Sequence, residues 1–183
     1  MKKIVLTFGL IAGAVLAAML FITMAFQDKI GFDNGEVIGY TSMVVAFLLT
    51  FFGVRSYRDN VAGGTVKFGR AVVVGALISV VASLCYVAAW EVIYSKMVPD
   101  FIEKYQAHVF EKARAAGETE AALAQKKAEY AKYAEMYRNP AIRAAITFLE
   151  PLPVALIVTL VSAGVLSRRR GPVPSGAGAA VRA

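Results

Sequence analysis

Four long apolar stretches dominate the pattern of hydrophobic and polar positions along this chain. They cover residues 4–26, 37–54, 71–95 and 147–166. Each stretch meets or approaches the roughly 20 helical residues that a hydrocarbon core of about 30 Å requires. Within them the only formal charges are Glu91, near the end of the third stretch, and Glu150, near the start of the fourth. The pattern therefore predicts an all-α integral membrane protein with four transmembrane helices.

The segment between the third and fourth stretches has a different pattern. Residues 96–145 alternate Ala, Glu, Lys and Tyr, a mixture that favours helix, and Gly117 divides them. Apolar residues recur at three- and four-residue steps on both sides of the glycine, which predicts amphipathic helices over 99–116 and 120–138. Thr119 is suited to be the N-cap of the second helix. Because interfacial helices usually carry a cationic polar face, the nearly balanced charge favours a projecting hairpin over helices lying on the membrane surface.

Two proline signals mark the chain after this hairpin. Asn139 and Pro140 begin a new helix, since a proline in the first turn loses no hydrogen bond. This helix continues through Phe148 and is expected to kink or break over residues 150–153, which contain two prolines. The Gly-, Pro-, Ala- and Ser-rich residues 171–183 predict a disordered cytoplasmic tail, leaving residues 1–170 as a single transmembrane domain.

Basic residues outside the apolar stretches and the 96–145 segment fall almost entirely on one side of the predicted membrane. That side has Lys2, Lys3, Arg55, Arg58, Lys67, Arg70, Arg168, Arg169, Arg170 and Arg182. The short connection over residues 27–36 has only Lys29. Because basic residues in short loops resist translocation, both termini and the loop 55–70 are predicted to be cytoplasmic. The connection 27–36 and the hairpin segment 96–145 are then extracytoplasmic.

The same distribution explains the formal net charge of +7 without a nucleic-acid partner. The excess charge comes mainly from cytoplasmic anchors, which attract the anionic headgroups of membrane lipids. Lys2 and Lys3 ahead of an apolar run also fit a secretory signal peptide, but the run is longer than a typical signal and lacks a clean small-residue cleavage site. We therefore expect an uncleaved first helix.

Small residues recur at four-residue spacing in two of the spans. These residues are Gly9, Gly13 and Ala17 in the first span and Gly75, Ser79 and Ser83 in the third. Helices in a bilayer associate through close backbone approach, so both stripes should face neighbouring helices. Packing within one chain is the ordinary interpretation, and formation of a homo-oligomer is the alternative.

Glu91 and Glu150 are the leading candidates for functional residues, because a carboxylate at membrane depth is costly unless it is paired, neutralised or hydrated. Both should lie near the outer membrane level, where they can share a proton or a cation. The competing interpretation is ion pairing at the interface, and Lys96, Arg138 and Arg143 are close enough in sequence to serve. Glu150 also precedes a proline and can stabilise a helix start.

The loop between the second and third spans is the other candidate. Its chemistry lies in Arg55, Tyr57, Arg58, Asp59 and Arg70, with glycines at 63 and 64 that permit a tight turn. Its cations are suited to a phosphate headgroup or an acidic partner. It lacks the spacing of a phosphate-cradling nucleotide loop and the lysine and serine or threonine that follow its glycines, so a structured turn with topological anchors is the alternative.

Other chemistry is sparse in this sequence. Cys85, the single cysteine, lies in the middle of a span and allows no intramolecular disulfide. His108, the single histidine, supplies too few ligands for a metal site and is expected to be a solvated surface residue. We find no catalytic, metal-binding or cofactor-binding constellation in the sequence, so an enzyme is the least favoured class.

Five motifs resemble those of the bacterial domain-of-unknown-function family DUF4199. They are FGVRSYRD (52–59), GG (63–64), FGRA (68–71), WEVIY (90–94) and FLEPLP (148–153). The resemblance extends over nearly all of the chain before the tail. It implies a bacterial inner-membrane protein of four helices with an outer helical insertion, and it implies no activity.

Two functional hypotheses follow. The first is a small non-enzymatic membrane protein that acts as an accessory, scaffold or envelope-interaction component, with a protein partner bound through the outer hairpin. The second is an oligomeric proton- or cation-coupled carrier or channel, with Glu91 and Glu150 as its titratable pair. Four spans leave little interior for a pathway, which favours the first hypothesis.

Overall fold

The computed structural model describes residues 1–168, and the predicted tail lies outside this part of the chain. The helices are α1 (Lys2–Ala25), α2 (Gln27–Ile30), α3 (Phe32–Asn60), α4 (Phe68–Lys96), α5 (Phe101–Ala115), α6 (Glu120–Arg138), α7 (Pro140–Leu149) and α8 (Leu152–Leu166). The described residues contain no strand. Four segments are long and apolar enough to cross a membrane, namely α1, α3, α4 and the combined α7–α8 segment. The predicted all-α membrane fold is therefore confirmed, with a second span that is longer at both ends than predicted.

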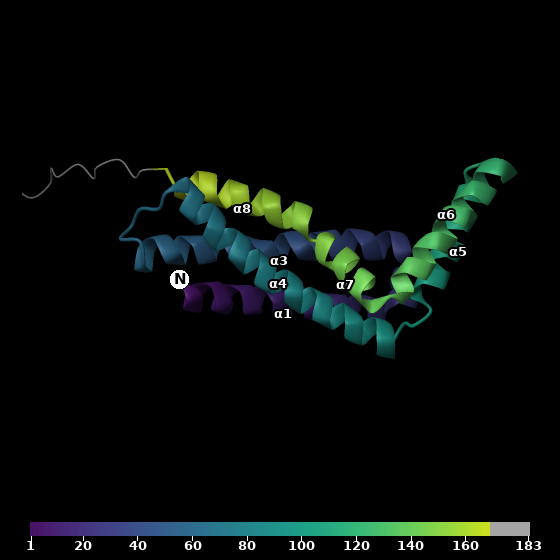
Figure 1. The fold of residues 1–183 in the computed structure, drawn as a ribbon, viewed down its shortest axis with the longest axis horizontal. Helices are drawn as coiled ribbons and strands as arrows, with labels where there is room; N and C mark the ends of the chain where they lie inside the picture. Colours follow the sequence, from purple (N-terminus) through teal and green to yellow (C-terminus); the bar gives the residue numbers. More distant parts are fainter. Residues whose placement is uncertain (169–183) are drawn as a thin grey trace, which may run out of the picture.

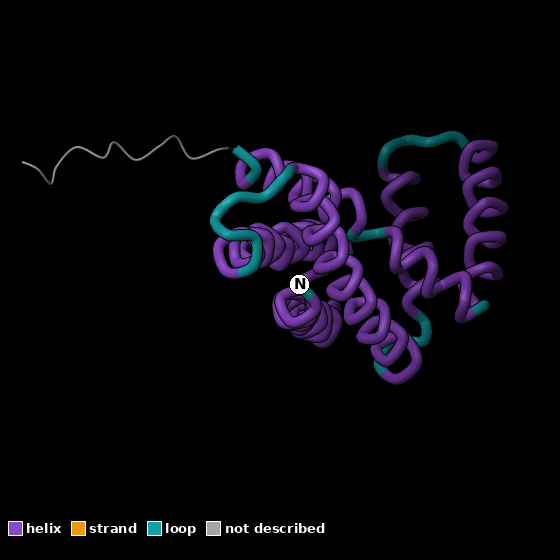
Figure 2. The backbone as a smooth tube through the Cα atoms, turned by 60° about the vertical axis from the view of Figure 1, so that its left-hand side comes forward, coloured by secondary structure: helices purple, strands orange, loops and turns teal. Residues whose placement is uncertain are grey.

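The long helices lie side by side, and the chain is polarised along their direction (Figure 1). The N-terminus, the α3–α4 loop and the end of α8 lie together at one end, which we call the loop end. The helices α5 and α6 lie at the opposite end, which we call the hairpin end. Figure 2 shows these two helices as a neighbouring pair set apart from most of the bundle.

Small residues allow the spans to approach closely, as the sequence predicts. A Cβ atom added at Gly13 would lie 2.5 Å from the Cβ of Cys85, and one added at Gly9 would lie 2.7 Å from the Cβ of Val81. At Gly75 the added atom would lie 2.9 Å from the Thr159 side chain on α8. These glycines therefore set the spacing of α1 and α8 on the central helix α4.

The α3–α4 loop is a structured turn. Gly63 and Gly64 have φ angles of 69° and 88°, a region that glycine adopts without steric cost. The Gly64 amide donates to the Arg58 carbonyl at 2.9 Å, which closes the end of α3. Val66 returns from the turn into the core, where it packs with Tyr57.

The predicted hairpin and the predicted helix break are both present. The Thr119 hydroxyl accepts from the Ala122 amide at 3.3 Å and caps α6, and Asn139 Oδ1 accepts from the Ala141 amide at 3.0 Å and caps α7. The break falls at residues 150–151, between α7 and α8. It changes the packing, because α8 packs on both α3 and α4, whereas α7 packs on α4 and on α6.

Candidate functional site

The most strongly bound charge at the hairpin end is Arg143 on α7. Its Nε donates to Glu91 Oε1 at 2.9 Å and its Nη2 donates to Glu91 Oε2 at 2.5 Å, a two-point contact between α7 and α4. The guanidinium also lies 4.3 Å from the centre of the Tyr94 ring and donates to the Tyr137 carbonyl at 3.3 Å. Arg143 is buried, with 7% of its surface exposed. The ion-pair interpretation of Glu91 is thus confirmed, and Arg143 is its partner.

An aromatic cluster extends this contact to the hairpin. Trp90 Nε1 donates to the Tyr137 hydroxyl at 2.6 Å, and both side chains are buried. The Phe101 ring lies 5.0 Å from the Trp90 ring in an edge-to-face arrangement, which joins the start of α5 to the same cluster. Burial raises the pKa of the Tyr137 hydroxyl, which favours its neutral form as an acceptor for the indole. Both hairpin helices are therefore fastened to α4 at their base.

A second attachment joins α5 to the start of α3. Lys112 Nζ donates to Asp33 Oδ1 at 2.7 Å, and the His108 ring nitrogen Nε2 lies 3.3 Å from the same oxygen. Asp33 raises the pKa of Lys112 through this contact. The Phe32 ring lies 5.2 Å from the His108 ring and 5.6 Å from the Tyr105 ring. His108 is therefore not the solvated residue that the sequence predicts, because it is only partly exposed and contacts α3.

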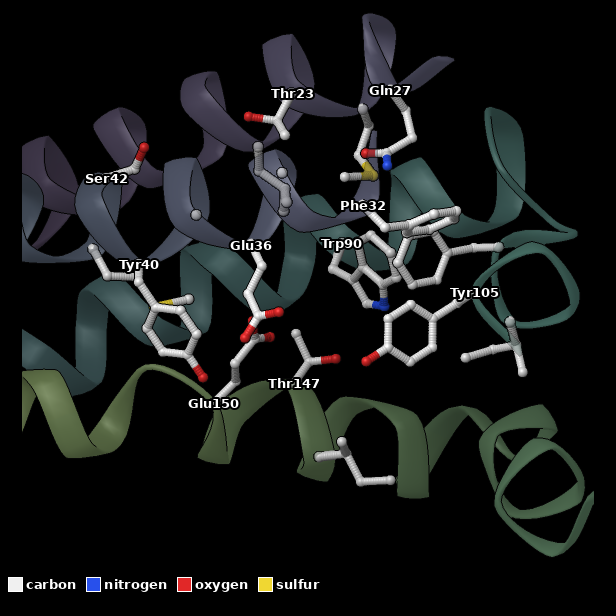
Figure 3. A pocket seen from close by; sticks show the side chains of 18 of the residues that line it. Thr23, Gln27, Phe32, Glu36, Tyr40, Ser42, Trp90, Tyr105, Thr147 and Glu150 are labelled. Atoms are coloured by element: carbon white, nitrogen blue, oxygen red, sulfur yellow. The ribbon is translucent and has the colours of Figure 1, made fainter. Parts of the chain in front are cut away.

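A cavity of about 550 Å³ lies between these two attachments. Helices α1, α3, α4, α5, α6 and α7 all contribute to its lining. Figure 3 shows Tyr40, Glu36, Glu150 and Trp90 directed toward this space. The cavity exists because α7 stays on α4 and does not follow α8 onto α3. Such a volume is within the range of small-molecule sites in proteins.

Glu150 lies at the break between α7 and α8 and lines this cavity. The Tyr86 hydroxyl donates to Glu150 Oε2 at 3.1 Å. Glu150 is exposed, and its side chain is directed toward the cavity (Figure 3). Glu91 does not line the cavity, so the two carboxylates have separate partners, Arg143 for one and Tyr86 for the other.

The candidate residues at the α3–α4 loop are divided between the core and the surface. Tyr57 is buried among core residues, and Arg58 is buried while its Nε donates to Asp59 Oδ1 at 2.7 Å. Arg55 lies 3.7 Å from the Asp59 carboxylate and is exposed, as is Arg70 at the start of α4. The structure therefore uses Tyr57 and Arg58 to hold the turn and leaves Arg55 and Arg70 at the surface.

Sequence reasoning did not identify the cavity or most of its lining. Glu36, Tyr86, Tyr105 and Thr147 come from four different helices, and nothing in their spacing indicates that they meet. One sequence signal for a polar site at this end is Glu36, a charged residue in the first turns of the long second span. Within residues 1–168, no group of three or more His, Cys, Asp or Glu side chains is arranged to hold a metal ion.

Comparison with known proteins supports the family assignment. Neither the curated proteins nor the solved structures contain a significant match to this chain. A family model described as a protein of unknown function, DUF4199, matches residues 7–168, which is most of the chain. The resemblance of the five sequence motifs is thereby confirmed, and the chain belongs to the DUF4199 family.

Proposed function

We propose that this membrane protein is a non-enzymatic component of a bacterial inner membrane that presents its α5–α6 hairpin to another component of the cell envelope. In this orientation the hairpin is extracytoplasmic and both termini are cytoplasmic. The basic residues Lys2, Lys3, Arg55, Lys67 and Arg70 at the loop end support the orientation, because such residues favour the cytoplasmic side. They also support contact with anionic lipid headgroups there.

The single observation that carries this proposal is the fixed attachment of the hairpin at its base. Tyr137 and Arg143 hold the junction between α6 and α7 to α4, and Lys112 holds α5 to α3. The two helices also hold each other, since the Gln106 side chain donates to the Tyr130 carbonyl at 2.8 Å. The hairpin tip around Gly117 lies away from the bundle (Figure 1). A rigid arm of this kind is suited to contact a partner at a defined distance and angle.

The hairpin tip can be removed without touching its base. Replacing residues 113–126 by a short glycine turn keeps Lys112, Tyr137 and Arg143, and therefore keeps both attachments. We expect this variant to insert into the membrane normally and to lose an in-cell photo-crosslink made from a reactive residue at position 127. A discrete product that persists with the same yield in the truncated variant would contradict the proposal.

A double variant tests separately whether attachment of the hairpin base matters. Arg143→Gln combined with Glu91→Gln removes the ion pair at the base, keeps the Trp90–Tyr137 and Lys112–Asp33 contacts, and leaves the tip unchanged. We expect the crosslink from position 127 to weaken, whereas a crosslink from the lipid-facing Leu160 should be unaffected. Equal hairpin crosslinking in this double variant and in the original protein would show that attachment of the base has no functional role.

The carrier hypothesis receives less support from the geometry. It requires Glu91 and Glu150 to act as a titratable pair, but Arg143 neutralises Glu91 outside the cavity. A flux measured in vesicles that depends on both carboxylates would restore this hypothesis. Glu150 alone keeps a position suited to binding, because it lines the cavity.

A further inference from the structure

The cavity at the hairpin end combines apolar, aromatic and acidic surfaces. Leu16, Leu20 and Met43 supply apolar contacts from α1 and α3. Tyr86 and Trp90 supply aromatic rings from α4. Tyr40 and Glu36 on α3 and Tyr105 on α5 are directed into the same space (Figure 3). A ligand that fits this lining must have both an apolar body and a polar group.

The charge of the lining is unbalanced toward carboxylates. Asp33, Glu36 and Glu150 line the cavity, whereas Lys112 is the single lysine or arginine among the lining residues. Lys112 is already bound to Asp33, and His108 contacts the same Asp33 oxygen. Two carboxylates therefore remain without a basic partner from the described lining residues. The polar group of a complementary ligand must be cationic.

Glu150 is the carboxylate most in need of such a partner. It lies within the fourth span, where a carboxylate is costly unless it is paired, neutralised or hydrated, and a cationic ligand would supply the pairing. Its described partner is the Tyr86 hydroxyl, which donates one hydrogen bond and carries no positive charge. Arg143, on the same helix α7, is occupied by both oxygens of Glu91. The protein therefore offers Glu150 no basic side chain within ion-pair distance in the described part of the chain.

We propose that this cavity binds an amphiphilic organic monocation, with the charged centre beside Glu150 and the apolar body against the aromatic and aliphatic walls. Aromatic rings attract organic cations directly, and Tyr86 and Trp90 are among the lining residues, with the Tyr86 hydroxyl bound to Glu150. An inorganic divalent cation is less suitable, because it requires several converging oxygen ligands. The cavity volume of about 550 Å³ accommodates a ligand of drug size. This binding function is independent of a partner at the hairpin tip.

The test uses the full-length protein in phosphatidylcholine vesicles and two probes of equal size and opposite charge. Tetraphenylphosphonium is the cation and tetraphenylborate is the anion, and empty vesicles correct for partition into lipid. We expect saturable binding of the cation and none of the anion by equilibrium dialysis. Trp90 lines the cavity and is the single tryptophan of the chain, so its fluorescence should change with the same saturation curve.

Three charge-neutralising variants identify the site. Glu150→Gln removes the central charge and should weaken cation binding by at least about tenfold. Glu36→Gln should weaken it by about threefold, because it removes the second lining carboxylate that has no basic partner but keeps Glu150. Glu111→Gln changes net charge by the same amount on an exposed face of α5 outside the cavity, and binding should be unchanged. Equal binding by all three variants and the original protein would overturn the proposal.

A fourth variant blocks the cavity without removing a charge. Gly39 lines the cavity, and a Cβ atom added there meets no atom within 4 Å. Gly39→Leu should therefore fold normally and abolish saturable cation binding. If Glu150→Gln fails to fold, this variant still decides the outcome. Undiminished cation binding in Gly39→Leu, or equal binding of cation and anion as expected for a lipid acyl-chain site, would contradict the proposal.

Discussion

The two ends of the bundle are held together by different interactions. At the loop end, α8 packs on both α3 and α4, and Gly75 and Thr159 bring the α4 and α8 backbones together. At the hairpin end, α7 packs on α4 and α6, and Arg143 with Glu91 and Trp90 with Tyr137 supply the specific contacts. The first end is joined by close packing and the second by hydrogen bonds around a cavity.

This difference follows from the break between α7 and α8. A continuous fourth helix would follow α3 to both ends and fill the space that the cavity occupies. Pro151 and Pro153 interrupt the helix, since proline has no amide hydrogen to continue the hydrogen-bond ladder. The redirected α7 loses packing area against α3 and gains directional polar contacts with α4. We infer that the loop end sets the stability of the bundle and that the hairpin end is suited to binding.

The largest expected effect comes from disturbing close packing between α1 and α4. Gly13→Leu would place a Cβ atom 2.5 Å from the Cys85 Cβ, a separation that side chains cannot adopt. Relief of this overlap requires α1 to move away from α4, and overpacking of this severity costs more than about 3 kcal/mol. Denaturant titration in mixed micelles, followed by Trp90 fluorescence, measures the loss.

Gly39→Ala is the matched control for that prediction. Gly39 also lies within a long span, but an added Cβ meets open space. Alanine has the higher helix propensity, so the variant should be as stable as the original protein or slightly more stable. Equal stability of Gly13→Leu and Gly39→Ala would show that contact between α1 and α4 does not determine the stability of the bundle.

The next effect comes from the buried ion pair of the hairpin end. Arg143→Gln leaves Glu91 near the membrane without its cation. The Glu91 side chain is 30% exposed and can be partly hydrated, so we expect a loss of about 2 kcal/mol, less than for a fully buried pair. Denaturant titration in mixed micelles, followed by Trp90 fluorescence, measures this loss of stability.

A double-mutant cycle isolates the contribution of this pair. Glu91→Gln combined with Arg143→Gln removes both charges, and its total cost should be smaller than the sum of the two single costs. Strictly additive costs would contradict the assignment of these residues as energetic partners.

The helices and their ends were predictable from sequence because their signals are local. Thr119 and Asn139 cap α6 and α7 by contacts within three residues, and the glycine turn at 63–64 depends on its own backbone. The stripe of Gly9 and Gly13 identified a packing face correctly, although it could not name Cys85 and Val81 as the residues across the contact.

The candidate site was predictable only in part, because it depends on which distant residues meet. The sequence offers Glu91 three basic residues as ion-pair partners. Only the packing of α7 on α4 shows that Arg143 is the partner. Glu150 and Tyr86 are far apart in sequence and belong to different spans. Periodicity identifies the faces of single helices, but it does not show that α7 diverges from α3 and leaves a cavity.

The smallest effect that we predict concerns one hydroxyl group. Tyr137→Phe removes the acceptor of the Trp90 indole and leaves a buried N–H group unsatisfied, at a cost of about 1 kcal/mol. Tyr40→Phe is the control, because Tyr40 is 47% exposed and its hydroxyl can be replaced by water. Trp90 is the single tryptophan, so its emission should shift in the first variant and not in the second. If Tyr137→Phe changed neither emission nor stability, the hydrogen bond would not fasten the hairpin. The ion pairs of Arg143 and Lys112 and the ring contacts of Phe101 and Phe32 would then carry its attachment.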